Sequence, residues 1–197
     1  METIRSSRIK LVLVFALFIG PLCIAFLWYY GLGSILVPKN QTNNANLISP
    51  VVTLSSFSDS LSDASPFTLD SLKRKWTIVH IVKEDCSDSC KESLYNTRQT
   101  RIAVGKDANR IQRLLLLENQ NLLNELQFNH ADLIISQYSA SMLAEQMEEI
   151  RVDQKLGPDD AILVDPLGNV MMVIPVALNP SLLLKDFKKL LKLSRVG

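Results

Sequence analysis

The longest apolar stretch of the chain lies near its N-terminus. Residues 11–37 contain no charged side chain, whereas about 20 apolar residues suffice for a helix that crosses the roughly 30 Å hydrocarbon core of a bilayer. Trp28, Tyr29 and Tyr30 lie within the run, as in the aromatic belt of a membrane interface. The pattern predicts a transmembrane signal anchor over residues 11–37.

Basic residues flank this run unequally. Arg5, Arg8 and Lys10 precede it, whereas Lys39 alone follows it closely. The positive-inside bias therefore places residues 1–10 in the cytoplasm. We expect a single-pass protein of the bacterial inner membrane with a periplasmic C-terminal domain.

Two alternatives to an anchor concern the same run. The apolar region of a cleaved signal peptide spans about 7–15 residues, which is much shorter than the observed run. Cys23 would suit a lipoprotein, but Leu22 is larger than the small residue normally found before such a cysteine. We therefore expect the anchor to be retained, with Cys23 packed inside it.

The next segment, residues 38–69, is polar and rich in serine. Few of its side chains are bulky enough for a packed core, which favours a flexible linker. Random-coil scaling gives such a linker an end-to-end distance of about 30 Å.

From there on, strand and helix patterns alternate. WTIVHIV, residues 76–82, is a β-branched apolar run bounded by charge and predicts a buried strand. A helix is expected from about residue 85 to residues 101–104, and LLLLE at 114–118 predicts a second strand. Residues 131–151 show the pattern of one amphipathic helix.

The C-terminal part continues this alternation. AILVDPLGNVMMVIP predicts a β-hairpin whose turn is fixed by Asp165, and LLLKDFKKLLKL predicts a last helix with a leucine face and a lysine face. The order β-α-β-α-β-β-α is that of a thioredoxin-like α/β domain, a central sheet flanked by helices, over residues 70–197.

Composition narrows the possible chemistry. Lys+Arg 21 against Asp+Glu 20 excludes a strongly basic nucleic-acid binder, and no nucleic-acid partner is expected. Three cysteines and two histidines exclude a disulfide framework and a zinc-ribbon array.

The candidate chemistry lies in Cys86 and Cys90, which follow the first strand and open a helix. Free N–H groups and the positive end of the helix dipole stabilise a thiolate there. A thiolate is the nucleophile of disulfide exchange and a soft ligand suited to Cu(I). We predict both cysteines as catalytic residues of thiol–disulfide exchange and as Cu(I) ligands. A small structural disulfide is the alternative, although so short a loop gives little chain-entropy stabilisation.

The CSDSC motif after WTIVHIVKED, together with VDPLGN near the end, resembles the Sco group of thioredoxin-like proteins. YNTRQTR at 95–101, followed by GK at 105–106 and NR at 109–110, more closely resembles a divergent proteobacterial group of single-span proteins found with cytochrome oxidase assembly factors. The resemblance implies a membrane-anchored protein that delivers copper to, or reduces, the binuclear copper site of cytochrome c oxidase subunit II. It implies oxidase subunits or other assembly factors as partners.

Two positions depart from the Sco pattern. Lys91 stands where Sco proteins usually have proline, and no histidine lies near Gly157, where their third copper ligand is expected. We interpret His80 as a packed strand residue and His130 as a surface or capping residue. A two-thiolate Cu(I) site remains open, whereas the absent histidine argues against a three-ligand Cu(II) site.

Arg98 and Arg101 share one face of the predicted helix. They are candidates for docking an acidic partner or phospholipid headgroups, with a solvated face as the alternative. Two other functions remain open at this point. One is a non-enzymatic scaffold with incidental cysteines, and the other is a general periplasmic thiol reductant without a copper role.

Overall fold

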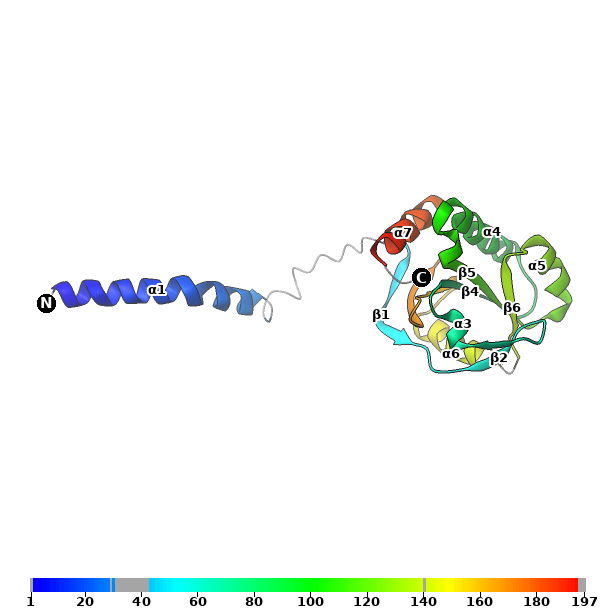
Figure 1. The fold of residues 1–197 in the computed structure, drawn as a ribbon, viewed down its shortest axis with the longest axis horizontal. Helices are drawn as coiled ribbons and strands as arrows, with labels where there is room; N and C mark the ends of the chain where they lie inside the picture. Colours follow the sequence, from blue (N-terminus) through cyan, green and yellow to red (C-terminus); the bar gives the residue numbers. More distant parts are fainter. Residues whose placement is uncertain (1, 29, 31–42, 140, 195–197) are drawn as a thin grey trace. The chain divides into compact units, whose positions relative to one another are not determined.

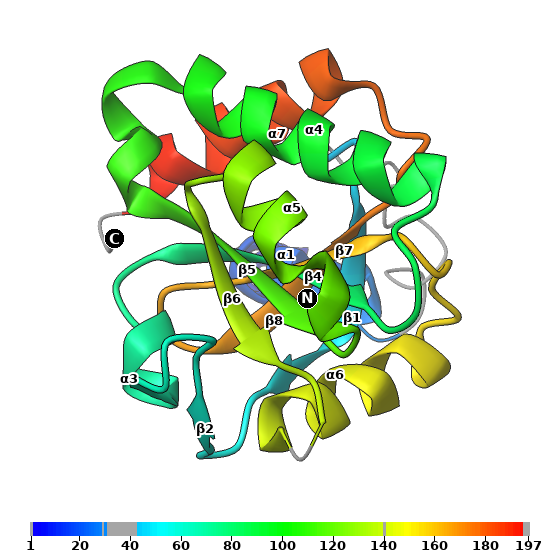
Figure 2. The ribbon, with the colours of Figure 1, turned by 90° about the vertical axis from the view of Figure 1, so that its right-hand side faces the viewer.

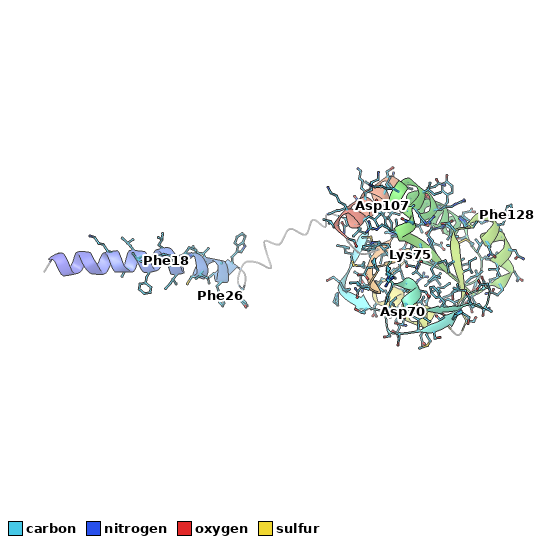
Figure 3. All side chains as sticks on the ribbon, viewed as in Figure 1. Phe18, Phe26, Asp70, Lys75, Asp107 and Phe128 are labelled. Atoms are coloured by element: carbon cyan, nitrogen blue, oxygen red, sulfur yellow. A yellow bond between two sulfur atoms is a disulfide. The ribbon has the colours of Figure 1, made fainter. Side chains whose placement is uncertain are left out.

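The computed structural model describes residues 2–28, 30, 43–139 and 141–194. The chain divides into two compact units, Met1–Gln41 and Thr42–Gly197. The first unit contains helix α1 (Glu2–Leu27), with Pro21 inside it (Figure 1). Large apolar side chains between Val12 and Leu27, among them Phe18 and Phe26, are exposed (Figure 3).

The expected membrane anchor is not supported. Within the part of the chain that the structure describes, no helix combines the length and the apolar character needed to cross a membrane. The predictions of a transmembrane signal anchor over residues 11–37, and of an inner-membrane protein with a periplasmic domain, are therefore wrong. The uncharged run extends beyond the helix: α1 ends at Leu27, so its uncharged part is shorter than the about 20 residues of a typical span. Residues 31–37 of the predicted anchor lie outside the described residues.

The structure also differs from the expected linker at residues 38–69, of which 38–42 lie outside the described residues. Three strands occupy this segment: β1 (Asn46–Thr53), β2 (Ser58–Ser60) and β3 (Pro66–Thr68). Four of its large apolar side chains are buried in the core: Ile48, Leu54, Phe57 and Phe67. These buried side chains, rather than the average polarity, make the segment part of the domain.

The second unit is built on a six-stranded sheet of order β1-β8-β7-β4-β5-β6, and β2 and β3 form a separate antiparallel pair. Three strands at one side are parallel; they are β4 (Trp76–Val82), β5 (Ile111–Leu117) and β6 (Leu133–Gln137). The parallel strands bring the ends of β4, β5 and β6 to one edge of the sheet, where connecting loops gather.

The other side of the sheet is antiparallel. The predicted hairpin is present as β7 (Ala161–Val164) and β8 (Asn169–Ile174), with β7 paired to β4 and β1 paired to β8. Asp165 fixes the turn as expected, because its Oδ1 accepts from the amides of Leu167 and Asn169, each at 2.8 Å. The thioredoxin-like α/β fold with a central mixed sheet is confirmed.

Helices cover both faces of this sheet (Figure 2). One face carries α4 (Asp88–Ala103), α5 (Leu123–Asn129) and α7 (Pro180–Leu193), and the other carries α3 (Leu69–Leu72) and α6 (Met142–Asp153). Short 3-10 helices, η2 (Gly105–Arg110) and η3 (Gln120–Leu122), precede β5 and α5. Alternate residues of β4 serve the two faces, since Val79 and Ile81 pack with α6 whereas Val82 packs with α4.

One predicted helix is two elements. Residues 131–151 form β6 and then α6, with residue 140 outside the described residues. Ser141 explains the break, because its hydroxyl caps α6 by accepting from the Ala144 amide at 3.0 Å. The apolar run before it is short enough for a strand beside β5, which periodicity alone does not distinguish from a buried helix segment.

A buried ion-pair cluster fastens α4 to the sheet. Arg113 on β5 is fully buried. Its Nη1 lies 3.1 Å from both carboxylate oxygens of Asp132, and its Nη2 donates to the Leu94 carbonyl at 2.7 Å. Arg98 and Arg101 on α4 also face Asp132, at 3.8 and 3.7 Å. One carboxylate therefore balances three guanidinium groups.

We expect Asp132→Ala to reduce the free energy of unfolding by about 3–5 kcal/mol, because it leaves the Arg113 charge buried without an acidic partner. Urea unfolding followed by circular dichroism measures the change. Asp70→Ala is the matched control: Asp70 pairs with Lys73 at 2.7 Å on the surface (Figure 3), and its loss should cost at most about 1 kcal/mol. Equal effects of the two substitutions would contradict the structural role given to Asp132.

Candidate functional site

The predicted cysteine pair is brought together at the end of β4. Cys86 and Cys90 form a disulfide, with their Cα atoms 5.2 Å apart. Cys90 lies in the first turn of α4 and is 3% exposed, whereas Cys86 lies in the preceding loop and is half-buried. An attacking group from solvent can therefore reach the sulfur of Cys86 more readily than that of Cys90.

Ser87 sets where α4 begins. It is the N-cap residue, and its hydroxyl accepts from the Cys90 amide at 3.2 Å. The cysteine segment thus lies where free N–H groups and the helix dipole present positive charge. After reduction, this environment stabilises a thiolate over a thiol.

A second loop faces the cysteine segment, between α6 and β7. Arg151 holds this loop by donating from Nη2 to the carbonyls of Gly157 and Pro158, at 2.8 and 2.7 Å. Asp160 accepts from the amides of Gly157 and Val176, at 2.9 and 3.1 Å. The loop is thereby fixed, and it presents Asp159 to the serines between the two cysteines.

His80 is a packed strand residue, as predicted, and is 4% exposed. Its Nε2 lies 3.0 Å from Thr97 Oγ1. The Thr97 hydroxyl hydrogen is donated to the Ser93 carbonyl at 2.9 Å, so towards His80 the oxygen acts as an acceptor and the imidazole proton is assigned to Nε2. Burial, and then the charge of Arg113, hold the pKa of His80 well below its usual range, so the ring is neutral.

His130 lies near the ion-pair cluster of Arg113, Arg98 and Asp132. It is the C-cap of α5 and is half-buried, so it lies at the end of a helix and not at a helix start. Burial, and then Arg113 and Arg98, lower its pKa. The charges that act on it are those of the arginine cluster around Asp132.

Arg98 and Arg101 also bind within the domain. Arg98 donates from Nη1 to the Asn129 carbonyl at 2.9 Å, and Arg101 donates from Nε to the Ile111 carbonyl at 2.8 Å. Together with their ion pairs to Asp132, these bonds tie α4 to the neighbouring elements. Partner docking by the two arginines stays a prediction from the sequence.

The described side chains around the cysteine pair do not form a three-ligand copper site. Among them, no group of three or more His, Cys, Asp or Glu side chains is placed to hold a metal ion. Both sulfurs of the pair are joined to each other, and the loop expected to supply a histidine near Gly157 supplies Asp159 instead. A three-ligand copper site does not fit these residues.

Asp159 is the site residue that sequence reasoning missed. Its partner Ser87 is identifiable from the sequence as a helix-start residue, but Asp159 lies 72 residues after Ser87 and 70 after Ser89. No local pattern in LGPDD distinguishes Asp159, which reaches the site, from Asp160, which fixes its own loop. Only the pairing of β7 with β4 brings the two segments together.

Comparison with known proteins agrees with this fold. The model of a family described as transmembrane-like, thioredoxin-like, C-terminal domain matches residues 76–194. No curated protein matches the sequence significantly. Copper-bound ScoI of Bradyrhizobium japonicum is similar in structure, with a TM-score of 0.54 and 16% identity over 70% of this chain and 99% of that one.

Two further solved structures have the same fold. Copper-bound yeast Sco1 gives a TM-score of 0.59 with 15% identity over 71% of this chain and 92% of its own. BsSco, a member of the Sco family of cytochrome c oxidase assembly proteins in which a disulfide switch has been identified, gives 0.53 with 15% identity over 72% and 95%. The domain therefore has a Sco-like thioredoxin fold.

The neutral, buried His80 should make stability depend on pH. The unfolded chain binds a proton at this residue below about pH 6.5 whereas the folded chain does not. The free energy of unfolding should therefore fall by up to about 1.4 kcal/mol per pH unit as the pH drops below about 6.5. Urea unfolding at several pH values should give a shallower slope for His80→Gln than for wild type. An unchanged slope would show that His80 takes up a proton in the folded state.

Proposed function

Because the chain belongs to the family of transmembrane-like, thioredoxin-like C-terminal domains, we propose that it exchanges disulfides with a protein partner through Cys86 and Cys90. The observation that carries the proposal is the unequal burial of the bonded pair at a helix N-terminus. The half-exposed Cys86 is the attacking residue, and the buried Cys90 is the resolving residue. A structural disulfide needs no such difference, and its four-residue separation puts its chain-entropy contribution near the low end of about 2–4 kcal/mol.

The reaction starts from the reduced pair. The Cys86 thiolate attacks one sulfur of a partner disulfide, which forms a mixed disulfide and releases the other partner sulfur as a thiolate. Cys90 then loses its proton to solvent and attacks Cys86 Sγ, so that the Cys86–Cys90 bond forms and the second partner thiolate leaves. Two electrons pass from the pair to the partner, and a dithiol reductant must return the pair to its reduced form.

We propose a cysteine pair of a cytochrome c oxidase subunit, or of another oxidase assembly factor, as the partner. The support is the Sco-like fold together with the CSDSC and VDPLGN motifs. A three-ligand copper site does not fit the described residues, so the proposed exchange uses the two sulfurs alone. The chain would then reduce a disulfide of its partner. After reduction of the pair, the same two thiolates would remain candidate ligands for Cu(I).

The two cysteines should differ in reactivity. In the full-length protein, Cys90→Ser leaves the half-exposed Cys86 free, and Cys86→Ser leaves the buried Cys90 free. We expect Cys90→Ser to form a mixed disulfide with oxidised glutathione about tenfold faster or more, because exposure and thiolate character control the rate. Mass spectrometry of quenched samples measures the two rates. Equal rates, or a faster Cys86→Ser variant, would contradict the assigned roles.

The partner assignment is tested in the native host. Replacing Cys86 and Cys90 together by Ser should lower cytochrome c oxidase activity in membranes several-fold while the protein remains folded and present. Cys23→Ser, at the exposed free cysteine of α1, is the matched control and should leave oxidase activity unchanged. Normal oxidase in the double variant would remove the oxidase role, and would favour a scaffold in which the cysteines are incidental.

A further inference from the structure

Asp159 joins two loops of the site that are far apart in the sequence. Its Oδ2 accepts from Ser87 Oγ at 3.1 Å and also from Ser89 Oγ. Both serines lie between Cys86 and Cys90, so the carboxylate holds the segment that closes the disulfide loop. Arg151 and Asp160 fix the backbone of the loop that carries Asp159, which makes it a firm attachment point.

The serine hydroxyls extend this contact to the helix. Ser87 Oγ also accepts from the Cys90 amide at 3.2 Å and lies 2.9 Å from Ser89 Oγ. Each serine hydroxyl has one hydrogen, and Asp159 Oδ2 accepts both of these hydrogens. The Ser87 oxygen therefore acts as the acceptor towards the Cys90 amide. The hydrogen bond of the Cys90 amide to Ser87 therefore depends on the Asp159 carboxylate, which belongs to another loop.

Asp159 also brings a negative charge next to the pair. It lines a small cavity together with Cys90 and His80, and His80 is neutral. It also lines a groove of about 600 Å³ beside the end of β4. The other charged residues that line this groove carry both signs: Lys83, Glu84, Asp85, Glu148, Arg151 and Lys155. Arg151 is already bound to two carbonyls of the loop.

We propose that Asp159 is a positioning residue that holds the two serines between the cysteines and biases the pair towards its disulfide form. The proposal rests on the proposed exchange function and deepens it. A fixed negative charge makes a nearby thiolate less stable, whereas the helix N-terminus makes it more stable. Destabilising the reduced form makes a cysteine pair a stronger reductant, because a pair becomes an oxidant when its reduced form is stabilised. Asp159 therefore favours electron transfer from this chain to its partner.

The test compares three variants of the full-length protein in glutathione redox buffers. Asp159→Asn keeps an oxygen that accepts from the serines but removes the charge, and Asp159→Ala removes both. Asp153→Asn removes an exposed carboxylate on α6 and serves as the control for charge alone. The fraction of reduced Cys86–Cys90 is read by thiol alkylation and mass spectrometry, and hydrogen exchange reports the Cys90 amide.

We expect Asp159→Asn to shift the equilibrium about tenfold towards the dithiol, which corresponds to about 30 mV, with protection of the Cys90 amide kept. Asp159→Ala should give a similar shift and lose about tenfold of that protection, while Asp153→Asn matches wild type. An Asp159→Asn equilibrium equal to that of Asp153→Asn, or shifted towards the disulfide, overturns the bias. Unchanged amide protection in Asp159→Ala overturns the positioning role.

These readouts remain separate from the proposed function. The glutathione equilibrium and the amide protection are measured without any protein partner. A double cysteine variant with normal oxidase activity would remove the partner assignment and leave the result for Asp159 intact. Conversely, an unaltered equilibrium in Asp159→Asn would remove the inference while exchange through Cys86 still stands.

Discussion

The position of α4 depends on the positive charge of Arg113, which is buried between the sheet and α4. Such a charge is tolerated only where polar groups surround it. Asp132, the Leu94 carbonyl and the Thr97 hydroxyl supply these groups. Because Leu94 and Thr97 belong to α4, the same bonds that satisfy Arg113 also fix the helix against β5. The first turn of α4 carries Cys90, so the burial of that sulfur depends on this cluster.

The cluster also explains why the two sulfurs differ. Cys90 packs with Leu94 and Leu115 beneath the helix, whereas Cys86 only borders that core. Thr97 links Arg113 to His80 at 3.3 and 3.0 Å, which places a neutral ring rather than a charged one beside the cavity under Cys90. The pair thus has one reachable sulfur and one sheltered sulfur, which suits the proposed order of attack by Cys86 and then Cys90. Fold and chemistry are therefore linked through α4.

Many of the helices and strands were predictable from local sequence patterns. The buried strand at 76–82, the helix that follows the cysteines, the hairpin and the last helix all have clear periodicity or turn residues. The strands within 38–69 were not predicted, because the four large side chains that are buried there lie among many serines and do not change the average composition. Strand β6 was hidden because its short run also fits the helical pattern of α6. The apolar run near the N-terminus predicted too much structure. It suggested a membrane-spanning helix over residues 11–37, whereas α1 ends at Leu27.

Local sequence patterns identify only part of the candidate site. The cysteine pair is visible in the sequence because both residues lie in one turn, and its chemistry follows from that placement. Asp159 is not visible, because it reaches the serines only through the strand order that brings β7 beside β4. A histidine in that loop would offer a neutral ligand to a soft metal, whereas a carboxylate suits harder cations and adds negative charge. The loop where the Sco pattern has a histidine ligand thus presents Asp159 instead. This supports the proposed electron transfer and argues against a three-ligand copper site.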